Sequence, residues 1–566
     1  MFVPKLFTTL KNYNKKLFVS DAISGVIVGI VALPLAIAFA IASGVSPEKG
    51  LITAVIAGFI ISFLGGSRVQ IGGPTGAFII IVYGIIQKYG MDGLMIATIM
   101  AGIFLILMGF LKLGTLIKFI PLPIITGFTS GIALIIFTTQ IKDLFGLQLE
   151  NIPADFVEKI PVLFGNLNLL NPATTAISAL SLFIIIIFPR ITKKIPGTFV
   201  ALIVGTLVVY FFNLNVETIS TKFGVISSAI PPLTFPVITY ERVAGLISPA
   251  FTIALLGAIE SLLSAVVADG MTGNRHRSNM ELIAQGTANI ITPLFGGIPA
   301  TGAIARTVTN IKNGGKTPVA GLIHAVVLLL IMLFFGKYAG MIPLCVLGAI
   351  LAVVAYNMSE WREFKAQLKM PKSDVIVLLT TFFLTVVFDL TVAIEIGMVL
   401  SAFLFMRRMA AVTNMGILTR EFEENQVEEY GDNSIAGKDI PKYVLIYEVN
   451  GPFFFGAASK FKEAARVIED RVKVFIMRLR NVPAIDSTGI STIEDFYEDC
   501  QKNKITLVLS GIHAQPLFAA EKAGLLEKIG IDNCCGNIDD ALNRAREILG
   551  LEKQEVKAAR ESSIER

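Results

Sequence analysis

Two short segments with the same residue pattern interrupt the long apolar runs of this chain. The first reads GGPTGAF from Gly72, and the second reads GGIPATGAIAR from Gly296. Pro in the first turn and Thr at the cap are typical of helix starts, whose free N–H groups and positive dipole end bind anions. The matched pair therefore predicts two helix starts that face each other and form an anion site. The residues expected to line it are Thr75, Gly76, Thr301, Gly302 and Ala303.

Charged side chains within the apolar runs suggest a second kind of chemistry. Arg306 follows Thr301 within about a turn and a half of helix, and its guanidinium suits a carboxylate or another oxyanion. Glu260 lies in LLGAIESLLSAVV, with Ser264 one turn later on the same helical face. A charge at the bilayer centre costs roughly 3 kcal/mol, so such groups are usually functional or paired. Glu260 is expected to hold a coupling proton or sodium ion, or to be the structural partner of Arg306.

The composition shows which elements position these residues. The chain has 566 residues, of which 54% are hydrophobic and only 16% are charged. Its apolar runs reach the roughly 20 residues that cross a bilayer, and the first run is too long for a signal peptide. We therefore expect a polytopic α-helical membrane protein. The four Cys and three His form no spaced motif, so neither a metal centre nor a cofactor is expected.

Hydropathy and its breaks predict about fourteen membrane segments up to residue 412. Those near residues 74–87 and 301–312 are too short to cross alone, and they lie about 225 residues apart, as expected for two inverted repeats of seven segments. Basic loops such as PRITKKIPG and GNRHRSN fall on the side of the termini. The positive-inside rule therefore predicts cytoplasmic N- and C-termini, and it accounts for the basic residues without nucleic-acid binding.

The C-terminal part has the composition of a soluble domain. YVLIYEV, KVFIMRL and ITLVLSG are expected to be buried strands, with amphipathic helices ASKFKEAARVIEDR and STIEDFYEDCQK between them. This alternation predicts an α/β domain. The predicted divisions of the chain are an N-terminal cytoplasmic segment 1–20, a transmembrane domain 21–412, a linker 413–440, a soluble domain 441–550 and a tail 551–566.

Long stretches of the chain resemble the SulP family of anion transporters. They include PLAIAFAIASGVSPEKGLITA, GGPTGAF, GAIESLLSAVVADGMTGNRHRSNMELIAQGTAN and GGIPATGAIARTVTNIKNGGKTP, while NVPAIDSTGI resembles the STAS domain that ends most of these proteins. The resemblance implies a core domain of segments one to four and eight to eleven, and a gate domain of the others. It also implies an anion bound between the third and tenth helix starts, a homodimer, and a place in the inner (plasma) membrane.

The same resemblance implies roles for individual residues. It assigns Leu35 and Phe39, which follow Pro34, to the anion site; many sulfate permeases have Pro-Gln where this chain has Pro34-Leu35. It assigns anion binding to Arg306, and proton or cation coupling to Glu260. In the STAS domain, Ser487 matches the phosphorylated Ser of anti-sigma-factor antagonists. By itself, Asp-Ser-Thr before a helix is an N-cap. A cytoplasmic protein could be the partner of that domain.

Within the family, AIESLLSAVVADGMTG followed by ATGAIAR looks most like bacterial members that import four-carbon dicarboxylates. The expected function is thus proton-coupled uptake of fumarate, succinate or aspartate, by an elevator-like movement of the core against the gate. The alternatives are a sodium- or proton-coupled sulfate or bicarbonate transporter, and an uncoupled anion exchanger or channel. A nucleobase permease is disfavoured by Arg306, and a membrane-anchored signalling protein leaves the matched interruptions unexplained. No GxxxxGK[ST] loop is present, so ion gradients supply the energy.

Overall fold

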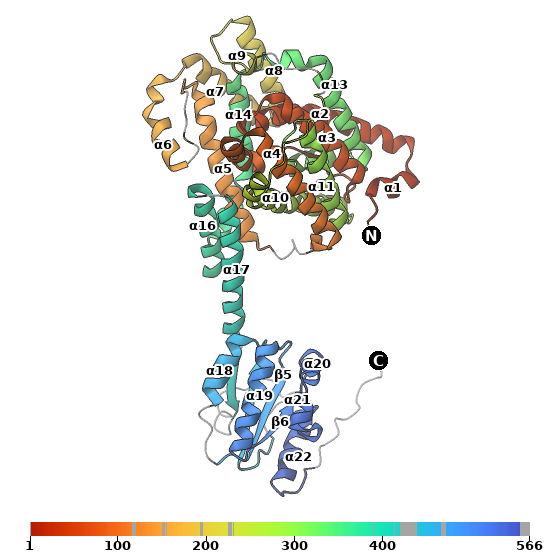
Figure 1. The fold of residues 1–566 in the computed structure, drawn as a ribbon, viewed down its shortest axis with the longest axis vertical. Coiled ribbons are helices and arrows are strands. Elements are labelled where there is room, and N and C mark those ends of the chain that lie inside the picture. The colour runs from red at the N-terminus through yellow and green to blue at the C-terminus, as the bar shows by residue number, and fades with distance from the viewer. Residues whose placement is uncertain are drawn as a thin grey trace. The chain divides into compact units, whose positions relative to one another are not determined.

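The computed structural model describes residues 2–115, 120–149, 153, 156–192, 196–224, 229, 231–388, 390–412, 414–418, 438–465 and 471–554. The chain divides into two compact units, Met1–Ser401 and Ala402–Arg566, and the division falls within helix α17 (Leu390–Val412). The first unit is helical, and the second contains a five-stranded sheet (Figure 1).

Long apolar helices make up the first unit. They start at residues that suit a helix N-terminus: the Asn14 side chain accepts from Leu17 N at 2.9 Å, and Thr317 accepts from Val319 N at 3.2 Å. The principal helices are α2 (Lys15–Ala42), α3 (Pro47–Leu64), α4 (Ile79–Phe110), α5 (Leu122–Phe145), α7 (Pro172–Ile191), α8 (Gly197–Phe211), α10 (Tyr240–Thr272), α11 (Ser278–Leu294), α12 (Ile304–Lys312), α13 (Pro318–Ala339), α14 (Leu344–Met358) and α16 (Lys372–Val387). The short helices are α1 (Lys5–Thr9), α6 (Phe156–Gly165), α9 (Ile219–Phe223) and α15 (Trp361–Gln367).

Helix α4 consists of two segments that meet at a sharp bend. Gly90 at the bend has φ 67° and ψ −170°, a conformation that Gly adopts without steric cost. Counting α4 as two gives seven segments from α2 to α8 and seven from α10 to α17, with the short α6, α9 and α15 left aside. Eight helices among the described residues are long and apolar enough to cross a membrane, whereas α12 has only nine residues.

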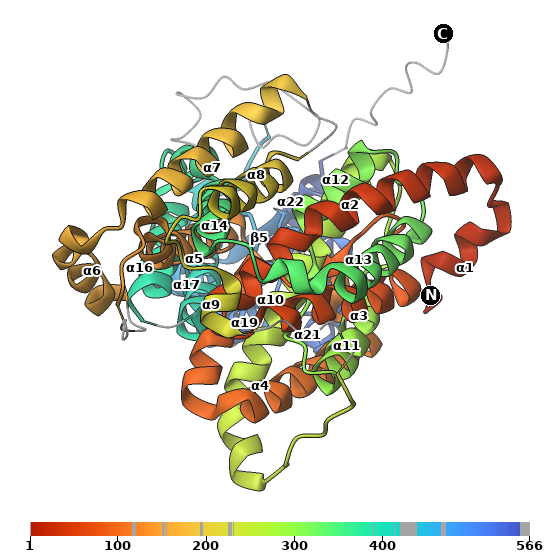
Figure 2. The ribbon, with the colours of Figure 1, turned by 90° about the horizontal axis from the view of Figure 1, so that it is seen from above.

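The helices of this unit pack in two groups (Figure 2). In one group, α4 packs on α10 and α11, and α13 packs on α2 and α3. In the other, α5 packs on α14 and α16, and α7 packs on α8 and α14. Weaker contacts of α2 with α8 and α14, and of α4 with α5, join the groups. These are the core and gate groups that the family resemblance implies.

The crossing of α4 and α11 depends on two glycines. A Cβ at Gly286 would lie 2.5 Å from the backbone oxygen of Gly102, and a Cβ at Gly102 would lie 2.6 Å from that of Gly286. Small residues let membrane helices approach to backbone contact, where dispersion supplies the attraction. Outward faces of the unit carry exposed side chains such as Phe183, Phe211 and Phe334, which suit contact with lipid.

The second unit is an α/β domain. Its sheet has the order β3-β4-β5-β6-β7, in which β3 (Asn414–Leu418) is antiparallel to β4 and the other neighbours are parallel. The other strands are β4 (Val444–Asn450), β5 (Val474–Asn481), β6 (Thr506–Ser510) and β7 (Cys534–Cys535). The helices are α18 (Phe455–Ala465), α19 (Ser487–Lys502), α20 (Ala514–Lys522), α21 (Leu525–Ile529) and α22 (Ile538–Ile548).

The structure differs from the predicted linker at one point. Residues 414–418, which the sequence analysis placed in the linker 413–440, form β3 and pair with β4 from Asn414↔Asn450 to Leu418↔Ile446. The acidic charge run that suggested a linker begins only after this strand. Most of the remaining linker, residues 419–437, and most of the predicted tail, residues 555–566, lie outside the described residues.

We predict that Gly286→Ala destabilises the membrane unit. The new methyl group would meet the Gly102 carbonyl oxygen at 2.5 Å and force α4 and α11 apart, and overpacking of this kind costs about 1–3 kcal/mol. Thermal unfolding of the full chain in detergent measures the effect. The control is Gly84→Ala, because nothing lies within 4 Å of a Cβ there. Equal unfolding temperatures for the two variants would show that the crossing does not depend on Gly286.

Candidate functional site

The two Gly-rich segments meet in the middle of the membrane unit. They form a two-stranded antiparallel sheet in which β1 (Gly72–Gly73) pairs with β2 (Thr301–Gly302), with Gly72 opposite Gly302. The Ala303 N–H extends this pairing by donating to the Ile71 carbonyl at 2.8 Å. An antiparallel pair is the relation expected of corresponding segments in two inverted repeats.

A helix start follows each strand of this pair. Thr75 has extended backbone, with φ −128°, before the 3₁₀ turn Gly76–Phe78 that leads into α4. Ala303, with φ −94°, precedes α12. The first N–H groups of a helix have no partner within it, so both starts present free donors and positive dipole ends. The structure thus brings together the two starts that the sequence paired.

The threonine hydroxyls in these segments have other partners. Thr75 Oγ1 donates to Glu260 Oε2 at 2.8 Å, and Thr301 Oγ1 donates to the Gly257 carbonyl at 2.8 Å. Both acceptors belong to α10. Neither hydroxyl caps its own helix, and both hold the strand pair against α10. The donors that remain for a ligand are therefore backbone N–H groups.

Arg306 is buried beside the first segment. Its side chain is 1% exposed, and Nη2 donates to the Pro74 carbonyl while Nη1 has no hydrogen-bond partner. A Cβ at Gly73, where φ is 150°, would lie 2.4 Å from Nη1, so only glycine leaves room for the guanidinium. A buried cation with an unused donor is costly unless something pairs with it, and an anionic ligand would supply that partner.

The two residues proposed for ion coupling, Glu260 and Ser264, have different hydrogen-bond partners. Glu260 accepts from Thr75, whereas Ser264 Oγ donates to Thr307 Oγ1 at 3.2 Å. Thr307 Oγ1 also accepts from Ile71 N at 3.0 Å, so Ser264 belongs to the support of β1. No ion pair joins Glu260 to Arg306 in the described ranges. The two charges nevertheless interact electrostatically, and the alternative that Glu260 is the structural partner of Arg306 stays a prediction.

A polar network behind the strand pair was not identified from the sequence. Gln70 Nε2 donates to the carbonyl and hydroxyl oxygens of Ser261 at 3.1 and 3.0 Å. Ser261 Oγ donates to Glu281 Oε1 at 3.3 Å, and the other oxygen of Glu281 accepts from Gly66 N at 2.8 Å and Ser67 N at 3.1 Å. Ser261 is a polar residue within an apolar run, which is a signal that could have identified it. Gln70 and Glu281 follow the polar stretches GGSRV and GNRHRSNM, where one more polar residue carries no such signal.

Two buried amides support the irregular backbone in the same way. Asn289 accepts from Ala300 N at 2.9 Å and donates to the Ala300 carbonyl at 2.8 Å. Asn310 Nδ2 donates to the Val69 carbonyl at 2.8 Å. Non-helical backbone at this depth is tolerated only where its polar groups have hydrogen-bond partners. The Asn289 and Asn310 amides supply such partners on both sides of the strand pair.

The gate group forms the other wall of the site. A Cβ at Gly76 would lie 3.2 Å from Met358 Sδ of α14, 3.5 Å from the Phe39 ring of α2 and 3.6 Å from Ile136 Cδ1 of α5. Phe39 is buried, whereas Leu35, one turn earlier, is half-buried against the same apolar cluster. The helix start at Gly76 therefore faces the boundary between the core and gate groups.

Ser487 lies in the second unit, away from these residues in sequence. It is the first residue of α19 and is exposed, and the preceding Asp486 caps the helix by accepting from Gly489 N at 2.8 Å. The N-cap expected from the sequence is therefore Asp486. Phosphorylation of Ser487 stays a prediction.

The two helix starts, the paired strands and the buried guanidinium together form a candidate anion site inside a helical membrane unit, an arrangement that suits a transporter. The chain matches the model of the sulfate permease family over residues 18–381 and that of the STAS domain over residues 437–541. It is 41% identical over 522 residues to a putative sulfate transporter, YvdB, of Bacillus subtilis, covering 92% of this chain and 96% of that protein. It is 30% identical over 545 residues to the bicarbonate transporter BicA of Picosynechococcus, covering 94% of this chain and 95% of the other.

Solved structures show the same fold. The murine solute carrier 26 family member A9 anion transporter superposes with a TM-score of 0.84 at 19% identity, covering 96% of this chain and 94% of that one. The transmembrane domain of a cyanobacterial BicA superposes with a TM-score of 0.61 at 31% identity, covering 69% of this chain and 98% of that domain. The expected fold class is confirmed.

The chain belongs to the sulfate permease family, and it is an anion transporter with a C-terminal STAS domain and not an enzyme. The relatives named here are called sulfate or bicarbonate transporters. A substrate preference for dicarboxylates stays a prediction from the sequence.

We predict that Glu281→Leu destabilises the membrane unit more than Glu281→Gln does. The leucine variant leaves the Gly66 and Ser67 N–H groups buried without an acceptor, at about 1–3 kcal/mol for each unsatisfied group. The glutamine variant keeps one oxygen that can accept. Thermal unfolding in detergent measures both, and an unfolding temperature for the leucine variant at or above that of the glutamine variant would contradict the assignment.

Proposed function

We propose that this chain is a secondary active transporter that takes up a small oxyanion by symport with a proton or sodium ion. One observation carries the proposal: β1 and β2 pair so that the helix starts at Gly76 and Ala303 lie together, with the Arg306 guanidinium beside them. Two dipole ends and one cation attract a single anion from different directions.

The substrate is held mainly by backbone donors in this scheme. The Thr75 and Thr301 hydroxyls are engaged with α10, and the Ala303 N–H donates to the Ile71 carbonyl. The N–H groups for the anion therefore come from Gly76, from Gly302 and from the first turn of α12 after Ala303. The absence of a side chain at Gly76 lets an anion approach the backbone, whereas the corresponding space at Gly302 is filled by the Gln70 side chain. Phe39 and Leu35 form an apolar wall that excludes water on the α2 side.

Coupling is assigned to Glu260 through its bond to Thr75. The carboxylate contacts the residue that starts the first helix, so a proton or cation bound at Glu260 changes the charge beside the anion. Neutralising Glu260 removes a repulsion that would otherwise oppose anion binding. The anion and the proton or cation at Glu260 should therefore bind together, because neutralising Glu260 favours binding of the anion.

An elevator-like movement fits the way the two groups meet. Met358 and Ile136 of the gate group lie next to Gly76, and apolar contacts of this kind can slide with little cost. The core would carry the strand pair, Glu260 and Arg306 as one body, because hydrogen bonds join them to α10 and α11.

Three substrates fit this description. The sequence stretch around Glu260 favours a four-carbon dicarboxylate, while the relatives are named for sulfate and bicarbonate. The size of the anion is limited by Phe39, Ile136 and Met358 around Gly76. A homodimer, cytoplasmic termini and a partner for the STAS domain remain predictions of the sequence.

Arg306→Ala is expected to lower uptake about 10–100-fold, since a charge-assisted hydrogen bond contributes about 1.5–3 kcal/mol. Proteoliposomes containing the full chain are offered labelled fumarate, succinate, sulfate and bicarbonate. The matched control is Lys312→Ala, an exposed cation on the same helix. Transport by Arg306→Ala at the control rate would remove this residue from the site, and transport of none of the four anions by the unmodified chain would contradict the proposed function.

Glu260→Gln is expected to keep downhill anion exchange and to lose accumulation driven by an ion gradient. The amide oxygen can still accept from Thr75, but the side chain no longer binds a proton or a cation. Uptake is measured with and without an inward proton or sodium gradient, and Glu241→Gln, an exposed carboxylate in the first turn of α10, is the control. Gradient-driven accumulation by the Glu260 variant would show that coupling lies elsewhere.

A further inference from the structure

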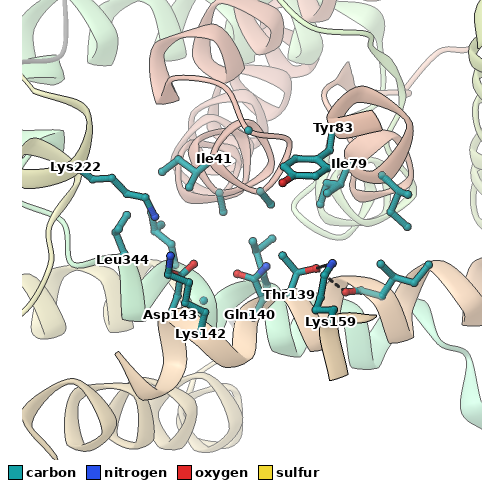
Figure 3. Close-up of a pocket in the computed structure, with 18 of the residues that line it drawn as sticks. Ile41, Ile79, Tyr83, Thr139, Gln140, Lys142, Asp143, Lys159, Lys222 and Leu344 are labelled. Atoms are coloured by element: carbon teal, nitrogen blue, oxygen red, sulfur yellow. Dashed lines mark hydrogen bonds between the residues drawn. The ribbon is translucent and has the colours of Figure 1, made fainter. Parts of the chain in front are cut away.

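An apolar groove lies on the gate group, formed by α5, α14, α15 and α16. It has a volume of about 540 Å³. The cavity drawn in Figure 3 is of a different kind, because it lies between the core and gate groups and is lined by charged side chains such as Lys142, Asp143 and Lys222. The groove therefore suits an apolar occupant.

Aromatic side chains make up most of the walls of the groove. Phe364 is buried at its base, where its ring stacks on Trp361 with 6.1 Å between centroids and meets Phe382 edge-on at 5.4 Å. Trp361 and Tyr356 are 58% and 72% exposed. An exposed apolar surface of this kind marks a place that another molecule covers. The six rings are Phe137 of α5, Tyr356 of α14, Trp361 and Phe364 of α15, and Phe382 and Phe383 of α16.

Hydrogen bonds fix the helices that carry these rings. Ser130 Oγ of α5 donates to the Ser359 carbonyl at 2.7 Å, and Ser359 Oγ donates to the Tyr356 carbonyl at 2.7 Å. Gln367 Nε2 of α15 donates to Thr126 Oγ1 of α5 at 2.8 Å. The two serine hydroxyls that line the groove are thus bonded to backbone oxygens. The groove is preformed, and it offers an occupant mainly apolar contacts.

The groove runs from one end of its helices toward their middle. Trp361 lies just beyond the end of α14 at Met358, and this end is cytoplasmic by the predicted topology. Along α5 the lining extends from Ser130 to Phe137, about 10 Å of helix. One leaflet has about 15 Å of hydrocarbon. The groove therefore matches the upper part of an acyl chain that starts at the cytoplasmic interface.

Two exposed cations lie beside Trp361 at this end. Arg362 follows it directly, and Lys365 lies one turn later on the same side of α15, because residues four apart are neighbours on a helix. Gln367 is on the side turned toward Thr126 of α5. Neither cation forms an ion pair with a residue that the structure describes. Both are therefore placed to meet an anion at the mouth of the groove.

The carboxylates of the same segment have less influence on such an anion. Glu363 is half-buried and accepts from Gln367 Nε2 at 3.3 Å. Glu360 is exposed just before Trp361 and opposes an anion there. Residues 360–372 contain these two carboxylates and four exposed cations, which are Arg362, Lys365, Lys369 and Lys372. This segment therefore has complementary charge to an anionic headgroup.

We propose that the groove binds an anionic phospholipid, with one acyl chain against the six aromatic rings and its phosphate at Arg362 and Lys365. A guanidinium suits the oxygens of a phosphate. Aromatic rings suit the level of the headgroups, where one end of the ring is apolar and the other is wet. A second copy of this chain across a two-fold axis would bring its own basic α15 toward these cations, so the charges favour a lipid. The site does not depend on which anion is transported.

The first test uses the single tryptophan of the chain, Trp361, as the probe. The full chain is reconstituted in phosphatidylcholine vesicles that contain either phosphatidylglycerol or phosphatidylcholine brominated near the start of the acyl chain, and bromine quenches a nearby indole. Phosphatidylglycerol should reach Trp361 at least about five-fold better at low salt, since each cation near an anionic lipid contributes a preference of that size. The preference should shrink at high salt because exposed charges are screened.

Arg362→Gln combined with Lys365→Gln should remove this preference and leave quenching by brominated phosphatidylcholine unchanged. Glu360→Gln should increase the preference, because it removes the carboxylate that opposes the phosphate. The matched control is Lys15→Gln combined with Lys16→Gln, which removes two exposed lysines at the same predicted side but on α2 of the core group.

The second test measures the lipid that stays bound after extraction. Native mass spectrometry is applied to the full chain extracted from vesicles of equal phosphatidylglycerol and phosphatidylcholine. Phe137→Ala combined with Phe383→Ala should lower the retained phosphatidylglycerol at least about five-fold, because two rings no longer contact the acyl chain. Phe183→Ala combined with Phe211→Ala is the control, since these exposed rings lie on α7 and α8 outside the groove.

Three results would overturn the proposal. Equal quenching by the two brominated lipids at low salt would show that the groove is ordinary contact with the bilayer. A preference that persists without Arg362 and Lys365 would place the phosphate elsewhere. Protection of Trp361 from both lipids, with a dimer that dissociates on Phe137→Ala and Phe383→Ala, would show that a second copy covers the groove. Transport is measured in neither test, so failure of the proposed function and failure of this site are distinguishable.

Discussion

The rest of the membrane unit depends on hydrogen-bond partners for the non-helical backbone of β1 and β2, which precedes the two helix starts. β1 and β2 satisfy each other in part, and Thr307, Asn289 and Asn310 bond to backbone groups of the residues that flank the two strands. Without water at this depth, each unpaired group would cost several kcal/mol. The buried polar side chains of α11 and α12 are therefore required by the site, because they allow non-helical backbone to persist inside the protein.

The need for buried hydrogen-bond partners also explains why the polar residues have different roles. Hydroxyls that looked available for a ligand are used to attach the strands to α10, as Thr75 and Thr301 show. In the proposed site, the groups left for an anion are the backbone N–H groups of the helix starts and one guanidinium with an unused donor. A site built from backbone donors is rigid, since its geometry follows from the strand register and not from side-chain rotamers.

Charge is distributed differently in the two groups of helices. The core contains Glu260 and Arg306 close to the strand pair, whereas the gate contributes apolar contacts at Gly76. This separation suits a transporter in which the core group moves relative to the gate group. In the proposed elevator-like movement, the moving core would carry the anion and the coupling ion together.

The sequence by itself determined the membrane class, the two helix starts and the charged residues near them, because apolar run length and Gly/Pro breaks are local signals. It also identified three strands of the STAS domain from their apolar periodicity. Only the tertiary structure decided which hydroxyls are occupied, that Ser264 supports β1 through Thr307, and that β3 extends the sheet into the predicted linker. It alone revealed the Gln70–Ser261–Glu281 network. These features depend on contacts between residues some 20 to 240 positions apart, and local patterns carry no information about such pairings.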